Sequence, residues 1–124
     1  MNYHEIRAGK IMLEEVQSCF NQGESFAIET TLAGKGYLKH IKRWREAGYH
    51  VSLYFLSLNN VKISIERVGQ RVSQGGHHIP TPVIQRRFKS GLTNFHNHYK
   101  PLVHTWSLYD NSTNTPLLLD WKEN

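Results

Sequence analysis

Residues Val51–Leu56 have the sequence VSLYFL, an almost entirely apolar run that stands between two helical patterns. Such a run predicts a β-strand covered on both faces, as in parallel sheets with crossover helices. The helical pattern before it covers Tyr37–Ala47 and stops at Gly48. The pattern after it covers Val61–Gln74, with Asn59-Asn60 as its N-terminal cap. A strand flanked by helices in this way favours an α/β fold.

The same alternation continues toward both ends of the chain. The further predicted elements are a helix at Tyr3–Asn21, a strand at Phe26–Thr30, a helix at Val83–Tyr99, a strand at His104–Tyr109 and a strand at Leu117–Trp121. Helices separate the first three strands, which is typical of a parallel sheet. A short turn around Pro116 precedes the last strand. We therefore expect three parallel strands plus a C-terminal antiparallel strand.

Composition limits the protein class and its partners. The chain has 124 residues, which fits a single domain over residues 1–124 with a modest core. Its net charge of +5 favours an anionic partner, although a solvated basic surface would give the same surplus. No apolar run has the length of a membrane span, and the start of the chain lacks a signal-peptide pattern. The single cysteine, Cys19, fits a reducing compartment, so we expect a cytoplasmic protein with no membrane partner.

The stretch Glu66–Phe95, ERVGQRVSQGGHHIPTPVIQRRFKSGLTNF, predicts two helices joined by a Gly-Gly-His-His loop at Gly75–Pro82. Arginines are concentrated on both sides of this predicted lid, and a planar guanidinium forms paired, charge-assisted hydrogen bonds with phosphate oxygens. Helical spacing places Arg71 and Arg87 beside the buried faces of their helices, whereas Arg86 points nearly opposite and either meets solvent or acts only when the lid closes. The pattern therefore predicts phosphate binding, against the alternative that all are surface charges near helix ends.

Polar triplets follow each of the three predicted parallel strands. They are Glu29-Thr30-Thr31, Ser57-Leu58-Asn59 and Asp110-Asn111-Ser112. Ligands of open α/β sheets bind beyond the carboxyl ends of the strands, so these triplets and the lid are expected at one rim. The eight histidines include His77-His78 and His96-x-His98, but no acidic or cysteine ligand recurs at a metal spacing. We therefore expect no metal site built by the protein.

Three segments resemble the zeta-toxin-type P-loop kinases. They are FAIETTLAGKGYLKHIKRWREAGYHVSLYFL, ERVGQRVSQGGHHIPTPVIQRRF and SLYDNS, and the resemblance extends from Ile6 to Ser112. It implies a P-loop-kinase-like sheet with a helical lid, ATP and Mg²⁺ as cofactors, and phosphorylation of UDP-N-acetylglucosamine or a similar substrate. It also implies that an antitoxin-like protein holds the enzyme inactive.

The resemblance also implies roles for particular residues. The lid arginines Arg71, Arg86 and Arg87 match catalytic positions that contact nucleotide or the transferring phosphate. The segment Glu29-Thr30-Thr31 matches the substrate cleft. The turn Asp110-Asn111-Ser112 matches the nucleotide side of the sheet.

This sequence departs from the family pattern in one respect. No G-x-x-x-x-G-K-[ST] phosphate loop occurs, and Gly34-Lys35 is followed by Gly36 where a magnesium-binding Ser or Thr is needed. The chain therefore corresponds to the C-terminal two-thirds of a zeta-toxin-like kinase domain, and we expect it to be inactive alone. A split gene, a mis-set start, a trimmed chain and a decayed remnant are all compatible with this. The gap left in the sheet would be closed by direct strand pairing or by a second chain.

Two classes of function follow from these observations. The first is an ATP-dependent phosphotransferase domain whose partner is a nucleotide or a phosphorylated small molecule. The alternative is a non-catalytic, truncated relative that acts as a nucleotide- or protein-binding module. A nucleic-acid binder is a distant third, because no RNA-binding signature accompanies the positive charge.

Overall fold

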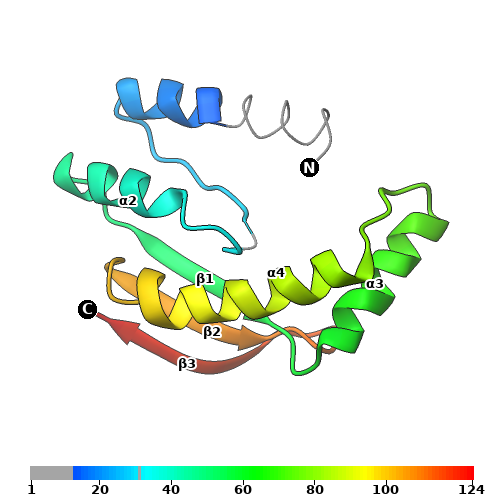
Figure 1. Cartoon of the computed structure of the whole chain (residues 1–124). Helices are drawn as coiled ribbons and strands as arrows, with labels where there is room; N and C mark the ends of the chain where they lie inside the picture. The colour runs from blue at the N-terminus through cyan, green and yellow to red at the C-terminus, as the bar shows by residue number, and fades with distance from the viewer. Residues whose placement is uncertain (1–12, 31) are drawn as a thin grey trace.

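A computed structural model describes residues 13–30 and 32–124 of the chain. Residues 13–21 are helical, and the rest of the helix predicted for Tyr3–Asn21 lies outside the described residues, as does Thr31. The elements that follow are α2 (Tyr37–Glu46), β1 (Ser52–Ser57), α3 (Val61–Ser73), α4 (Thr81–Asn94), the π-helical turn η1 (Phe95–Tyr99), β2 (Thr105–Asp110) and β3 (Leu117–Glu123). Figure 1 shows α4 lying along the sheet, with α3 inclined away from it at one end.

The sheet has three strands in the order β1-β2-β3. β1 and β2 are parallel, with Ser52 opposite Thr105 and Ser57 opposite Asp110. The helical pair α3–α4 forms the connection between them, so the carboxyl ends of both strands lie at one edge (Figure 1). β3 is antiparallel to β2. It contains a bulge at Leu119, which has no partner on β2 in the strand register. The α/β class and the antiparallel last strand are confirmed.

The prediction of a third parallel strand at Phe26–Thr30 is wrong. Residues 24–30 are extended but belong to no sheet. The side chains of Phe26 and Ile28 pack against the core, and Phe26 meets the edge of the Trp44 ring at a centroid distance of 5.0 Å. The burial of these side chains explains why the segment has the apolar pattern that predicts a strand. A strand also needs the backbone groups of a neighbour, and β1 does not pair with this segment.

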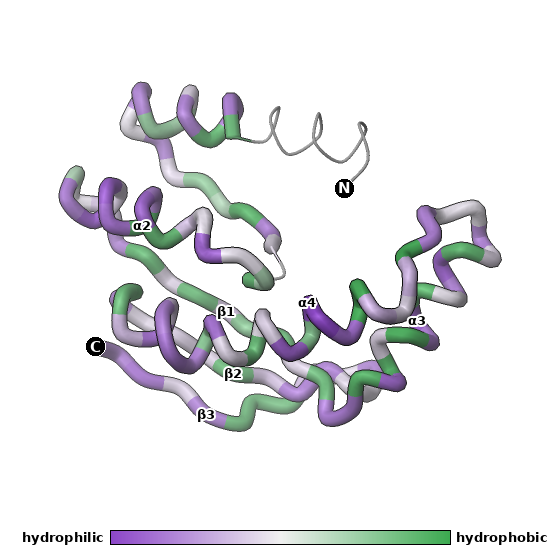
Figure 2. The backbone as a smooth tube through the Cα atoms, in the orientation of Figure 1, coloured by the Kyte–Doolittle hydropathy of each residue, from purple (hydrophilic) through white to green (hydrophobic). Residues whose placement is uncertain are grey.

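The expectation that β1 is covered on both faces is also wrong. Its exposure alternates along the strand, and Tyr54 and Leu56 are 67% and 53% exposed. Leu53 and Phe55 point the other way and pack against the core. Figure 2 shows that apolar residues occupy most of β1 and the first part of β3. The described helices thus cover one face of a three-stranded sheet, and no described element covers the other face, on which Tyr54 and Leu56 are exposed.

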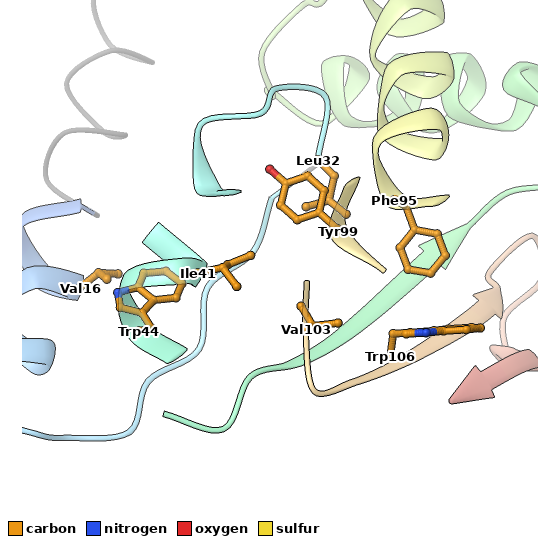
Figure 3. Close-up of a cluster of buried hydrophobic side chains, with 8 residues drawn as sticks. All are labelled: Val16, Leu32, Ile41, Trp44, Phe95, Tyr99, Val103 and Trp106. Carbon is orange, nitrogen blue, oxygen red and sulfur yellow. The ribbon is translucent and has the colours of Figure 1, made fainter. Parts of the chain in front are cut away.

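The core forms where α2 and the end of α4 meet the sheet (Figure 3). Its centre is made of Phe95, Tyr99 and Val103, none of which has any exposed surface. The Phe95 ring stacks on Phe55 at 4.6 Å and meets Trp106 edge-on at 5.9 Å. These aromatic contacts connect the end of α4 to both parallel strands. The core therefore holds α4 against the sheet at the end remote from the lid.

Local sequence explains how α3 and α4 begin. The Asn60 side chain accepts a hydrogen bond from the Lys62 N–H at 2.9 Å, so the predicted N-cap of α3 is confirmed. α4 begins at Thr81, two residues before the predicted start at Val83, because Pro82 fits the first turn of a helix. Among the described residues, no helix is long and apolar enough to cross a membrane.

Candidate functional site

The carboxyl ends of β1 and β2 carry a compact polar turn. The Ser112 hydroxyl and N–H both donate to the Asp110 carboxylate, and these hydrogen bonds, the hydroxyl first, hold the pKa of Asp110 below its ordinary value. The Asn111 N–H donates to the Ser57 carbonyl at 2.7 Å. The turn predicted as the nucleotide side is therefore an ordered continuation of the sheet with an ionised carboxylate.

Arg67 fastens the lid to this turn. Its Nη2 atom donates to the Asn111 carbonyl at 2.6 Å, across 44 residues of sequence. The Asn59 N–H donates to the Ser112 hydroxyl at 3.0 Å, so the loop before α3 is held as well. These contacts place the start of the lid at the carboxyl ends of the two parallel strands.

Arg67 was not among the predicted site residues. It is half-buried, and its guanidinium binds a backbone carbonyl rather than a carboxylate. The sequence does indicate that Arg67 lies near the predicted site, because Arg67 and Arg71 are one helical turn apart on the same face of α3. The partner at Asn111 depends on the tertiary fold, so sequence spacing alone does not separate an anchoring arginine from a ligand-binding one.

The two glycines of the lid loop end α3 in a defined geometry. Gly75 has φ +89°, a left-handed conformation that favours glycine. Its N–H donates to the Val72 carbonyl at 3.0 Å, and the Gly76 N–H donates to the Arg71 carbonyl at 2.6 Å, which is a Schellman motif. A Cβ at Gly76 would lie 2.6 Å from the Arg71 carbonyl oxygen. The Gly-Gly pair thus fixes the backbone beside Arg71.

The three predicted lid arginines have no side-chain partner among the residues that the structure describes. Arg71 and Arg86 are exposed and Arg87 is half-buried. Within residues 13–30 and 32–124, none of the three side chains forms a hydrogen bond or an ion pair. Arg71 lies in the last turn of α3, and the other two lie in the first half of α4, so the lid loop separates them. Their guanidinium groups are therefore available to an anion.

The predicted substrate segment lies in the extended stretch before α2. Glu29 and Thr30 are both exposed, and the Thr30 hydroxyl accepts a hydrogen bond from the Leu32 N–H at 3.3 Å. Thr31 lies outside the described residues. In the part of the chain that the structure describes, no contact joins Glu29 to the lid arginines or to the turn at Asp110. The structure brings together the lid and the turn, but not the substrate segment.

The described residues of this edge offer few ligands for a metal ion. The described residues contain no group of three or more His, Cys, Asp or Glu side chains that could hold a metal. Asp110 already accepts two hydrogen bonds from Ser112, which occupy one of its oxygens. Mg²⁺ bound with phosphates needs only one or two carboxylates and keeps several waters. Asp110 therefore offers one ligand at most, and the basic lid supplies most of the local charge.

Comparisons with known proteins identify the family of the chain. The zeta toxin family model matches residues 1–118. A protein of Haemophilus influenzae, described only as uncharacterized, is 30% identical over 84 residues. This match covers 68% of the present chain and 60% of the relative, so the chain spans less than two-thirds of the length of this curated protein. No solved structure gives a significant match. With nearly its whole length covered by the family model, the chain belongs to the zeta toxin family.

Proposed function

We propose that this chain is the lid- and substrate-bearing part of an ATP-dependent phosphotransferase that acts on UDP-N-acetylglucosamine or a similar UDP-amino sugar. One observation carries the proposal. Within the described part of the chain, Arg71, Arg86 and Arg87 have no side-chain partners, and they lie on a helical pair that Arg67 holds at the carboxyl edge of the parallel strands. Phosphoryl transfer depends on positioning and charge neutralisation, and arginines in this place serve both needs.

Each group of residues has a proposed part in the reaction. When bound, ATP with Mg²⁺ supplies the phosphoryl group and part of the charge neutralisation. Arg71 and Arg87 bind the phosphate oxygens from the two sides of the lid loop, and Arg86 joins them when the lid closes. The turn Asp110-Asn111-Ser112 borders the nucleotide. Glu29, Thr30 and Thr31 contact the substrate sugar.

The chain alone is proposed to bind polyphosphate without transferring it. Its sequence contains no phosphate loop, and such a loop supplies the lysine, the backbone N–H cradle and the magnesium ligand of related kinases. A second chain that adds a strand beside β1 would complete the sheet. The open edge of β1 and residues 24–30, which join no strand of the sheet, support such a partner. An antitoxin-like protein is the other proposed partner.

The alternative is a non-catalytic nucleotide- or protein-binding module. The observation in its favour is the open apolar sheet face, where Tyr54 and Leu56 are more than half exposed. Exposed apolar patches of this kind often mark protein-binding surfaces. A module of this type would bind its partner equally well with or without nucleotide.

Calorimetric titration with ATP and a non-hydrolysable ATP analogue tests the proposal. Arg71→Ala and Arg87→Ala should each weaken nucleotide binding about tenfold, because each removes a charge-assisted hydrogen bond. Lys62→Ala is the matched control, since Lys62 is an exposed cation on α3 nearer the start of the helix. Equal losses in all three variants would indicate diffuse charge and contradict the site. Phosphorylation of a UDP-amino sugar by the pure chain would contradict the proposed inactivity.

A further inference from the structure

A second basic hollow lies between α4 and the loop that leads into α2. Its volume is about 350 Å³, and its lining residues are Ala33, Lys35, Lys89, Ser90, Thr93 and Asn94. None of the predicted site residues lines it. Figure 1 shows the loop before α2 approaching α4 at this place. The hollow is therefore built from two segments more than fifty residues apart in sequence.

Buried side chains fix the loop that forms one wall. The Asn94 amide donates to the Leu32 carbonyl at 2.7 Å, and only 5% of Asn94 is exposed. The Tyr99 hydroxyl donates to the Gly34 carbonyl at 3.0 Å, and Figure 3 shows it directed away from the core centre toward this loop. Both donors belong to the end of α4 and η1. The loop wall is thus held in place by α4 itself, and a ligand would meet a preformed surface.

The lining carries two cations and no carboxylate. Lys35 and Lys89 line the same hollow, and neither side chain forms a hydrogen bond or an ion pair within the described residues. Two like charges at one hollow repel each other, and a bound anion removes that repulsion. Arg86 lies three residues before Lys89 and four before Ser90, so helical spacing puts it on the same face of α4. The basic row of α4 therefore continues into the hollow.

The donors in the lining suit a phosphate group. Two ammonium groups supply point charges, and the Ser90 and Thr93 hydroxyls supply neutral donors. A carboxylate has two acceptor oxygens, whereas a terminal phosphate has three and a larger charge, which matches several donors better. The volume of the hollow lies at the lower end of the range for small-molecule sites. The hollow is open to solvent and large enough for a phosphate or diphosphate group.

We propose that the hollow lined by Lys35, Lys89, Ser90 and Thr93 binds the phosphate or diphosphate group of a small molecule, at a site separate from Arg71 and Arg87. The inference rests on the proposed function in one respect, because it names the place where the anionic part of the phosphate-acceptor substrate is held.

Amide NMR spectra of the ¹⁵N-labelled chain, titrated with inorganic pyrophosphate, test the proposal. We expect saturable shifts at Gly34, Gly36 and Ser90, with the lid amides of Gly75 and Gly76 much less affected. The double variant Lys35→Ala/Lys89→Ala should weaken this binding at least about tenfold. Thr93→Val, which keeps the side-chain shape, should weaken it by a smaller factor. Lys62→Ala should leave it unchanged.

The same spectra separate failure of this site from failure of the proposed function. A titration in which the Gly34 and Ser90 amides do not respond, or in which the double variant responds like the original chain, overturns the proposal. Shifts that appear uniformly over the surface and vanish with moderate salt also overturn it. ATP is titrated separately with Arg71→Ala. Loss of ATP binding in that variant while pyrophosphate still shifts Gly34 supports two separate sites.

Discussion

Arg67 illustrates how one side chain decides the position of the lid. Its guanidinium donates to a backbone carbonyl at the end of β2, so the contact constrains both α3 and the turn that follows the strand. Arg71, one helical turn further along α3, has no such partner among the described residues. Two arginines of similar local sequence thus have different roles, one structural and the other available to a ligand.

The two arginines should differ in stability measurements. Arg67→Ala removes a charge-assisted hydrogen bond and should lower the free energy of unfolding by about 1–3 kcal/mol. Arg71→Ala should change it by no more than about 0.5 kcal/mol, because the side chain is exposed. Urea denaturation followed by circular dichroism measures both. A similar loss in the two variants would show that the Asn111 contact does not hold the lid.

His104 gives the fold a dependence on pH. Its Nδ1 atom accepts a hydrogen bond from the Val51 N–H at 2.9 Å, which requires an unprotonated nitrogen. Burial lowers the pKa of His104, and the charges of Arg45 and His50 lower it further. The His50 ring stacks on His104 at 4.7 Å. The pKa values of His40 and His96 are also lowered, mainly by burial.

The sign of the pH effect follows from these shifts. An unfolded histidine titrates near pH 6.5, above the folded value, so the unfolded state binds more protons as the pH falls below about 6.5. Stability is therefore full above this pH and decreases as the pH falls through the folded-state pKa. His104→Asn, which retains an acceptor, should flatten this dependence in urea midpoints between about pH 8 and pH 5. An unchanged slope in His104→Asn would show that His104 does not contribute to the pH dependence of stability. His78→Asn, in the exposed loop, is the control.

At the level of elements, the end of α3 depends on the Gly-Gly pair. The Schellman motif requires the left-handed backbone of Gly75 and the close approach of Gly76 to the Arg71 carbonyl. The loop between the lid helices is therefore not an unstructured linker. It sets the direction in which the chain leaves α3 and so the spacing between the arginines of the two helices.

Alanine substitutions at two glycines of this region should have opposite effects. Gly76→Ala places a Cβ 2.6 Å from backbone and should destabilise the protein by about 1–3 kcal/mol. Gly69→Ala lies in the interior of α3 with open space around the new atom, and should stabilise it by about 0.5–1 kcal/mol. Thermal unfolding of the two variants measures the difference. Equal midpoints would contradict the close approach at Gly76.

At the scale of the whole molecule, the two edges of the sheet are built differently. β3 carries Asp120, Lys122 and Glu123 and contains a bulge, features that discourage strand addition. β1 carries no charge, proline or bulge. The carbonyls of Val51 and Ser57 point toward β2. In a parallel ladder, alternate residues direct their backbone groups to opposite sides of the strand. The N–H and carbonyl groups of Ser52, Tyr54 and Leu56 therefore face the open edge of the sheet.

This asymmetry predicts association through β1. Leu56→Lys should reduce concentration-dependent self-association, because it places a charge on the unprotected edge strand. Leu117→Lys is the matched control on β3, where the leucine is 63% exposed. Sedimentation velocity over a range of concentrations measures the effect. A similar decrease in both variants would mean that the open apolar face, and not the β1 edge, drives association.

Local sequence was enough to predict the described helices, two parallel strands, the antiparallel last strand and the glycine-rich lid. These features depend on local periodicity, capping residues and turn chemistry, and each is contained in a few neighbouring residues. The family relationship was also predictable, because the matching segments are continuous in sequence. The arginines of the lid were identified in the same way, and their proposed roles stay predictions.

Which backbone and side-chain groups meet depends on the tertiary fold. The segment Phe26–Thr30 has the apolar pattern of a strand but finds no neighbour to pair with, and the apolar run of β1 is covered on one face only. The contact of Arg67 with Asn111 and the hollow between Lys35 and Lys89 join residues more than forty positions apart. The periodicity of a sequence shows which side of a segment is apolar. Whether that segment pairs with a strand, or lines a hollow, depends on which other segment packs beside it in the fold.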